Sequence, residues 1–257
     1  MAEAEIMLVE DVTAAALREV THGVLEGVAQ RGRAAIVLSG GSTPLPLYGR
    51  LAETELPWER VHVFWGDERF VELSDANSNA GAAMRALLDR VSVPESQIHP
   101  WPILQTPAAS AAAYHGVLER ALGPDPVFDV TLLGLGDDGH TASLFPGTGD
   151  ALRTEPTFAT TAPAGAAVRD RLTLGAKALS SSRLVIFLVT GAAKVPALRA
   201  TFGPDAPALP RGEPLPAATW GLVITGTLAA TARELDAHPA RVVTARERLL
   251  LITDQGF

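Results

Sequence analysis

Residues 34–41, Ala-Ala-Ile-Val-Leu-Ser-Gly-Gly, indicate the fold class of this chain. An apolar run of this length that ends in consecutive glycines is typical of a buried strand followed by a tight turn. Similar apolar runs occur at 61–65, 128–133 and 184–190, and a glycine follows each of them. We therefore expect four buried strands that end in the same way.

Ala- and Leu-rich stretches with helical periodicity lie between and around these strands, near 11–29, 45–53, 77–90, 108–121 and 192–201. Strands that alternate with helices are typical of an α/β protein. The sequence therefore predicts an open, mostly parallel, doubly wound Rossmann-like sheet with helices on both faces. In such a sheet the ligand binds beyond the carboxyl ends of the strands.

The chain lacks internal repeats and an obvious interdomain linker, so we expect residues 1–257 to form a single domain. The Pro- and Gly-rich stretch 203–216 is expected to be a surface loop. The segment that follows it is harder to interpret, although residues 242–255 have a strand-like pattern.

Composition and charge exclude several classes of protein. Of the 257 residues 47% are hydrophobic and the formal net charge is −8, so a core can form while nucleic acids and anionic membranes are unsuitable partners. No apolar run approaches the roughly 18 residues of a membrane span, and the acidic start is unlike a signal peptide. The absence of cysteine excludes disulfides and thiolate sites. We expect a cytoplasmic globular protein that is a monomer or a small homo-oligomer.

The first candidate binding motif is Ser39-Gly40-Gly41-Ser42-Thr43-Pro44, which joins a predicted strand to a predicted helix. Glycines allow the backbone to approach a ligand closely, and free N–H groups at a helix start attract anions. The motif lacks the Gly-Lys-Ser/Thr ending of a P-loop, so a small phosphorylated metabolite is favoured over a nucleoside triphosphate. The alternative is a tight turn with a Ser or Thr cap.

The second motif, Gly66-Asp67-Glu68-Arg69, follows a strand, and Asn77-Ser78-Asn79 opens the next helix. Two acids and an arginine directly after a buried strand stand where catalytic groups are usually found. The alternative is that the acids cap the next turn, with Arg69 as their ion partner and Asn77 or Ser78 as the helix cap.

The third motif runs from Gly134 to Pro146 and contains Asp137-Asp138-Gly139-His140. Its glycines match a dinucleotide-binding fingerprint, but the two aspartates would repel a pyrophosphate and Pro146 would cut short a following helix. We expect the glycines to shape a loop that presents His140. An aspartate beside it would orient the imidazole, although a lone histidine is more often structural.

The last two candidates are Arg171, within Arg169-Asp170-Arg171-Leu172-Thr173-Leu174, and Lys194, within Thr190-Gly191-Ala192-Ala193-Lys194. Lys194 falls in the first turn of a predicted helix, where a cation opposes the helix dipole. An anionic ligand at the same place would make that cation favourable. The alternative for each is a solvated surface charge.

In this order, over roughly residues 10–200, the motifs resemble the 6-phosphogluconolactonase branch of the family that also contains glucosamine-6-phosphate deaminases and isomerases. The form Asp-Gly-His-Thr-Ala-Ser-Leu-Phe-Pro at 138–146 is similar to the lactonases. The deaminases have a glutamate for ring opening in the region where Leu144 and Phe145 stand. They also typically have Asp-Glu-Tyr where this chain has Asp67-Glu68-Arg69. The last 55 or so residues match the family less clearly.

The resemblance implies hydrolysis of 6-phospho-D-glucono-1,5-lactone in the oxidative pentose phosphate pathway, with no metal and no organic cofactor. His140 would activate water, because imidazole titrates near neutrality. Either Asp67 or Asp138 would hold its tautomer, and Arg69 would stabilise the developing negative charge. Substrate binding would involve Asp138 and a phosphate site made of Gly40, Gly41, Ser42, Thr43, Arg171 and Lys194.

Three other functions stay open at this point. The chain could be a phosphosugar deaminase or isomerase of the same family. It could be a non-catalytic sugar-phosphate sensor, although the acidic charge and the lack of a helix-turn-helix pattern before residue 34 oppose this. A dinucleotide-dependent oxidoreductase is the least favoured.

Overall fold

The computed structural model describes residues 4–203 and 226–257, and within them six parallel strands form the main sheet in the order β1-β9-β8-β5-β2-β3. The predicted loop stretch from residue 204 onward lies outside the described residues. The strands are β1 (Glu5–Leu8), β2 (Ala34–Leu38), β3 (Val61–Trp65), β5 (Phe128–Leu133), β8 (Ser182–Val189) and β9 (Arg248–Thr253).

The central strands are hydrophobic throughout because they are covered on both faces. Every residue of β2 and β5 is buried, as are seven of the eight residues of β8. All four predicted strands are confirmed. β9 lies within the strand-like stretch 242–255 and pairs with both β8 and β1, so the C-terminal segment completes the sheet. The short edge strand β1 was not predicted.

Each of the five stretches with helical periodicity contains an α-helix, whereas the helices Ala176–Ser180 and Gly226–Ala237 were not predicted. The α-helices are α1 (Val12–Arg31), α2 (Leu45–Leu51), α3 (Asn79–Ala86), α4 (Pro107–Leu122), α5 (Ala176–Ser180), α6 (Val195–Phe202) and α7 (Gly226–Ala237). The 3-10 turns are Trp58–Arg60, Leu88–Arg90, Glu95–Gln97, Asp150–Leu152, Ala192–Lys194 and Pro239–Val242. None of the described helices is long and apolar enough to cross a membrane.

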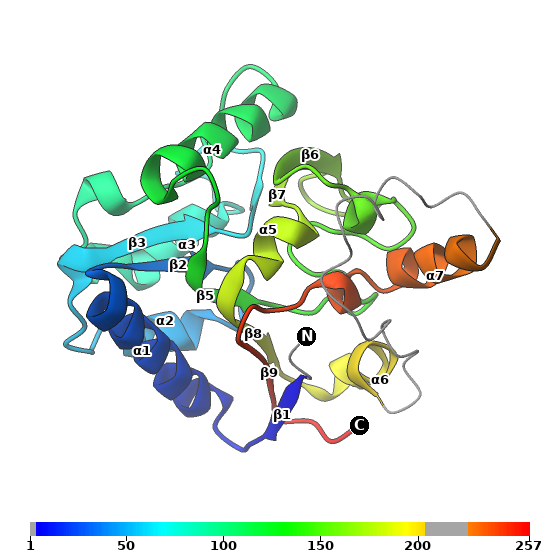
Figure 1. Cartoon of the computed structure of the whole chain (residues 1–257), viewed down its shortest axis with the longest axis horizontal. Helices are drawn as coiled ribbons and strands as arrows, with labels where there is room; N and C mark the ends of the chain where they lie inside the picture. Colours follow the sequence, from blue (N-terminus) through cyan, green and yellow to red (C-terminus); the bar gives the residue numbers. More distant parts are fainter. Residues whose placement is uncertain (1–3, 204–225) are drawn as a thin grey trace.

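Helices cover both faces of the sheet, as expected for a doubly wound fold. α1 and α2 lie on one side of the sheet, and α4 and α5 lie on the other (Figure 1). α1 begins at a cap in which Asp11 accepts a hydrogen bond from the Ala14 N–H at 2.8 Å, and it ends at the left-handed Gly32. Its buried residues pack across β2, β5, β8 and β9.

Two predicted helices have different extents in the structure. The stretch 77–90 is divided, because Leu87 leaves the helical conformation and a 3-10 turn follows α3. The stretch 192–201 is divided at Val195, so Lys194 lies in a 3-10 turn and caps α6 instead of standing in its first turn. The helix-dipole argument for Lys194 therefore applies to the residue just before α6.

A second, antiparallel sheet has the order β4-β7-β6 and was not predicted. Its strands are β4 (Asp67–Arg69), β6 (Thr157–Thr161) and β7 (Asp170–Leu174). Only Gly66 separates β3 from β4, and its N–H donates to Leu38 O of the main sheet while its carbonyl accepts from Leu174 N of the small sheet. The chain thus passes from one sheet to the other at Gly66, which places Asp67 and Arg69 above the carboxyl end of β3.

The strand order creates a crevice between β2 and β5. The chain leaves β2 toward β3 on one side, whereas it leaves β5 toward β8 on the other. Connections that diverge from neighbouring parallel strands leave a gap at the carboxyl ends of those strands. The loops after β2 and β5, which carry the Gly40 and His140 motifs, border this gap.

Candidate active site

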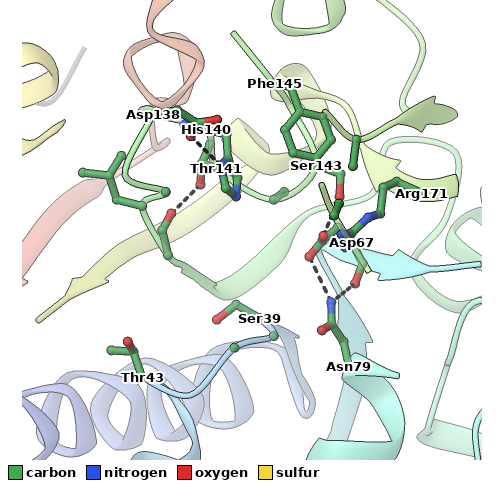
Figure 2. Close-up of a pocket in the computed structure, with 18 of the residues that line it drawn as sticks. Ser39, Thr43, Asp67, Asn79, Asp138, His140, Thr141, Ser143, Phe145 and Arg171 are labelled. Carbon is green, nitrogen blue, oxygen red and sulfur yellow. Dashed lines mark hydrogen bonds and ion pairs between the residues drawn. The ribbon is translucent and has the colours of Figure 1, made fainter. Parts of the chain in front are cut away.

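A cleft of about 640 Å³ lies at this carboxyl edge, a volume suited to a small metabolite. Figure 2 shows His140 and Asp138 on one side of it, Asp67, Ser143 and Arg171 on the other, and Ser39 and Thr43 below. The structure brings every predicted site residue to its lining: Gly40, Gly41, Ser42, Thr43, Asp67, Arg69, Asp138, His140, Arg171 and Lys194.

A tight turn after β5 presents His140 to the cleft. Gly136 N donates to His140 O at 2.8 Å, and Gly139 N donates to Gly136 O at 3.0 Å. A Cβ on Gly136 would lie 2.0 Å from Nδ1 of His140, so only glycine leaves room for the ring. No α-helix occurs between residues 134 and 149, which agrees with rejection of the dinucleotide fingerprint. The glycines shape the loop as predicted.

The imidazole of His140 is held by Asp138. Its Nδ1 lies 2.6 Å from Asp138 Oδ1, and the same oxygen accepts the backbone N–H of His140 at 3.0 Å. Burial opposes the charge on Asp138, but the backbone bond and the nearby His140 outweigh it and lower the Asp138 pKa. An ionised carboxylate only accepts, so Nδ1 carries the proton and Nε2 has a free lone pair.

The rest of this loop is anchored by two hydroxyls on either side of Ala142. Thr141 Oγ1 donates to Gly134 O at 2.8 Å, and Ser143 Oγ donates to Asp67 Oδ2 at 2.6 Å. Ala142 itself has φ 48°, a left-handed conformation that is unfavourable for a residue with a Cβ. The anchors on both sides hold this strained residue at the wall of the cleft.

Asp67 is buried and does not supply the bond to the His140 Nδ1 atom. Its carboxylate accepts from Ser143, as above, and from Asn79 Nδ2 at 3.3 Å, while its backbone carbonyl accepts from the same amide at 3.0 Å. Asp67 therefore ties β4 to the His140 loop and to the start of α3. Of the two aspartates considered as partners of the imidazole, the geometry selects Asp138.

Glu68 caps the start of α3, which is a structural role. Capping of the next turn is the alternative to catalysis that was expected for this acid from its place in the sequence. Its carboxylate accepts the backbone N–H groups of Asn79 and Ala80 at the start of α3, at 2.7 and 2.8 Å, and the Ser78 hydroxyl at 3.0 Å. Ser78 is the helix cap, as one of the two residues proposed for it. Burial raises the pKa of Glu68, and the N–H groups that it accepts offset part of that rise.

Arg69 and Arg171 lie directly opposite each other on the adjacent strands β4 and β7, where the register pairs their positions. Like charges directly opposite each other are unfavourable unless an anion compensates them. Burial lowers the pKa of Arg171 and the charge of Arg69 lowers it further, against the opposing effect of Asp67 and Glu68. The Nε atoms of both arginines are buried and have no hydrogen-bond acceptor within the described part of the chain. Arg69 donates from its Nη1 to Asn77 O at 2.6 Å, so the Nε–H groups are the donors of this pair that are left for an anion.

The Gly40–Thr43 loop lies beneath these groups with its backbone exposed to the cleft. Among the described residues, no acceptor is found for the backbone N–H groups of residues 40–43. A Cβ on Gly40 would lie 1.9 Å from Asn79 Oδ1, so the loop can pass close to Asn79 only with glycine there. Tyr48 holds Ser39, the residue just before the loop, because its hydroxyl accepts from Ser39 N and donates to Ser39 O.

Lys194 reaches the cleft from the carboxyl end of β8 and forms an ion pair with Asp137. Its Nζ lies 2.6 Å from Asp137 Oδ1. Sequence reasoning did not anticipate this pair, nor the roles of Tyr48, Asn79 and Ser143. The motifs contained Asn79 and Ser143, but their partners stand on distant segments of the chain.

Comparison with known proteins identifies the family of this chain. Residues 9–220 match the family described as glucosamine-6-phosphate isomerases/6-phosphogluconolactonase. The chain therefore belongs to that family, and its fold is the one found there, with a TM-score of 0.73 to a monomeric glucosamine-6-phosphate deaminase that is 18% identical. The resemblance drawn from the motifs is confirmed.

Three proteins similar to this chain are 6-phosphogluconolactonases. A 6-phosphogluconolactonase of Synechocystis is 45% identical over 192 residues, covering 73% of this chain and 79% of the relative. One of Mycobacterium leprae is 38% identical over 199 residues, covering 74% and 81%. The crystal structure of a 6-phosphogluconolactonase from Thermotoga maritima has a TM-score of 0.78 at 26% identity, covering 98% and 99%.

Proposed function

We propose that this protein hydrolyses 6-phospho-D-glucono-1,5-lactone to 6-phosphogluconate, a step of the oxidative pentose phosphate pathway. The observation that carries the proposal is the His140–Asp138 pair, which lies in one cleft with cations suited to an anionic substrate. The relatives named 6-phosphogluconolactonase support the same assignment. A cytoplasmic location and a monomeric or small homo-oligomeric state stay predictions.

In the proposed reaction His140 is the general base. Nε2 takes a proton from water while the water oxygen attacks C1 of the lactone, and the carbonyl oxygen becomes an oxyanion. Asp138 keeps the proton on Nδ1 and stabilises the imidazolium that forms. When the bond between C1 and the ring oxygen breaks, the imidazolium returns its proton to that oxygen, which leaves as the C5 hydroxyl.

Charged groups around the cleft supply binding and oxyanion stabilisation. Arg69 is assigned to the oxyanion, because a preorganised cation stabilises charge that develops in the transition state. The free N–H groups of residues 40–43, together with Arg171 and Lys194, are assigned to the phosphate. Asp67 offsets the charge of Arg171 and connects β4, the strand of Arg69, to the His140 loop.

The test is hydrolysis of freshly prepared 6-phosphogluconolactone, measured as 6-phosphogluconate formed above the spontaneous rate. His140→Ala protein, purified in the same way, is the matched control for contaminating lactonase. Activity in the native protein alone supports the proposal. If neither protein exceeds the spontaneous rate, while the native protein releases ammonia from glucosamine 6-phosphate, the deaminase alternative replaces it.

A further inference from the structure

The ion pair between Lys194 and Asp137 joins the loop after β5 to the turn after β8. Asp137 stands in the His140 loop immediately before Asp138, whereas Lys194 follows β8. The Lys194 side chain is 25% exposed and the Asp137 side chain is 75% exposed. The Asp137 carboxylate therefore approaches from the solvent side. It binds the ammonium group of Lys194, a residue that lines the cleft.

The cations of the cleft differ in this respect. The Nε atom of Arg171 is buried without an acceptor in the described residues, so its binding capacity is unused in this structure. Lys194 instead has a carboxylate oxygen at 2.6 Å, where one oxygen of a bound phosphate would stand. Nζ has three N–H donors, but a phosphate and the Asp137 carboxylate on the same ammonium repel each other, so phosphate binding favours release of Asp137.

We propose that Asp137 is an intramolecular competitor of the substrate phosphate for Lys194, and that it sets the affinity of the site for phosphorylated ligands. This inference rests on the proposed function, in which Lys194 binds the phosphate. The substrate displaces the Asp137 carboxylate toward solvent, where its 75% exposure allows it to be hydrated again. Substrate and product both carry the phosphate, so Asp137 weakens the binding of both by the same factor.

The size of the effect follows from the exposure of the pair. The Asp137 carboxylate is 75% exposed, so the pair is hydrated on that side. Surface ion pairs contribute about 0.2–1 kcal/mol, so displacement of Asp137 weakens phosphate binding by roughly 1.5- to 5-fold. Because ground state and transition state lose the same interaction, the effect appears in KM and leaves kcat unchanged. Salt reduces it, since ions screen an exposed pair.

The experiment compares Asp137→Asn, Lys194→Ala and the double variant with the native protein. KM for 6-phosphogluconolactone and the inhibition constant of 6-phosphogluconate are measured at low salt. Asp125→Asn is the matched control: it also removes one negative charge, but from an exposed residue before β5, at the opposite edge of the sheet. We expect Asp137→Asn to lower both constants by about 1.5- to 5-fold, and Asp125→Asn to leave them unchanged. In the Lys194→Ala background, Asp137→Asn should have no such effect.

Other outcomes separate the two levels of the proposal. If Lys194→Ala raises both constants but Asp137→Asn leaves them unchanged or raises them, Asp137 is not a competitor and the inference fails alone. If Lys194→Ala leaves both constants unchanged, the phosphate assignment of Lys194 fails with it. A drop in kcat for unphosphorylated gluconolactone in Asp137→Asn would show that the substitution acts through His140, which also contradicts the inference.

Discussion

Oδ1 of Asp138 accepts two hydrogen bonds from the same residue, His140: one from its backbone N–H at 3.0 Å and one from its ring Nδ1 at 2.6 Å. The two residues are separated only by Gly139, so a single turn contains both the imidazole and the carboxylate that orients it. The geometry leaves Nε2 to act on a substrate. The proposed base and the carboxylate that orients it thus lie in one short loop.

Replacement of the base should affect turnover more than binding. We expect His140→Ala to lower kcat by about 10²- to 10⁴-fold with little change in KM, because a general base acts mainly in the transition state. Steady-state kinetics corrected for spontaneous hydrolysis measure both constants. His22→Ala, at a histidine whose side chain is 72% exposed on α1, should behave as native. Near-native kcat in His140→Ala would remove His140 from the mechanism.

Asp138→Asn should lower kcat about tenfold, because a charge-assisted hydrogen bond to the imidazole is replaced by a neutral one. The lowered pKa of Asp138 means that its carboxylate is ionised at all pH values above the ordinary aspartate range. The loss should therefore be present at pH 6 as well as at pH 8, measured from kcat. Asp67→Asn is the comparison, and a larger loss of kcat there would return the orienting role to Asp67.

The phosphate assignment predicts a difference between two substrates. Charge-assisted hydrogen bonds contribute roughly 1.5–3 kcal/mol, so Arg171→Ala and Lys194→Ala should each raise KM for the phosphorylated lactone by about 10- to 150-fold. Competition from Asp137 places Lys194→Ala at the low end of this range. Unphosphorylated gluconolactone should be hydrolysed at the native rate. Equal losses for both substrates would mean that the cations act on the carbonyl or on the fold.

Glu68→Gln tests a structural role for that acid. The substitution replaces one carboxylate oxygen, an acceptor, with an NH2 group, a donor. That group would face a backbone N–H that is also a donor, so the free energy of unfolding should fall by about 1–3 kcal/mol. Because burial raises the Glu68 pKa, the stability linked to it is complete below the ordinary glutamate pKa and decreases as pH rises through the folded-state pKa. Urea unfolding of the native protein and of Glu68→Gln at pH 4 and pH 8 should show that dependence in the difference between the two proteins. Glu72→Gln, at an exposed site, is the control, and equal stability of both variants would contradict the role.

Chelation should leave activity unchanged. The described residues contain no group of three or more His, Cys, Asp or Glu side chains arranged to hold a metal ion, and the proposed base is a free imidazole. The measurement is kcat/KM before and after EDTA treatment. Loss of activity that Mg²⁺ or Zn²⁺ restores would show that the acidic turn at Asp137 and Asp138 binds a metal.

Local patterns in the sequence determined four strands of the main sheet and most of the charged residues of the site. Hydrophobic runs that end in glycine predicted β2, β3, β5 and β8 because burial on both faces requires continuous apolar strands. Parallel strands point the same way, so the polar residues that follow them had to meet at one edge. The identities of the cleft residues followed from this rule and from the motifs, before any partner was known.

Only the tertiary structure decided which of these residues contact one another. β4 has three residues, too few for a periodic pattern, so the pairing of Arg69 with Arg171 depends on its register with a distant strand. Glu68 became a buried helix cap and Asp67 an anchor for Ser143 because the chain changes sheets at Gly66. The contact of Asp137 with Lys194 joins two loops that are neighbours only because β5 and β8 pair. Secondary structure follows from local periodicity, whereas these contacts depend on strand register between segments far apart in the chain.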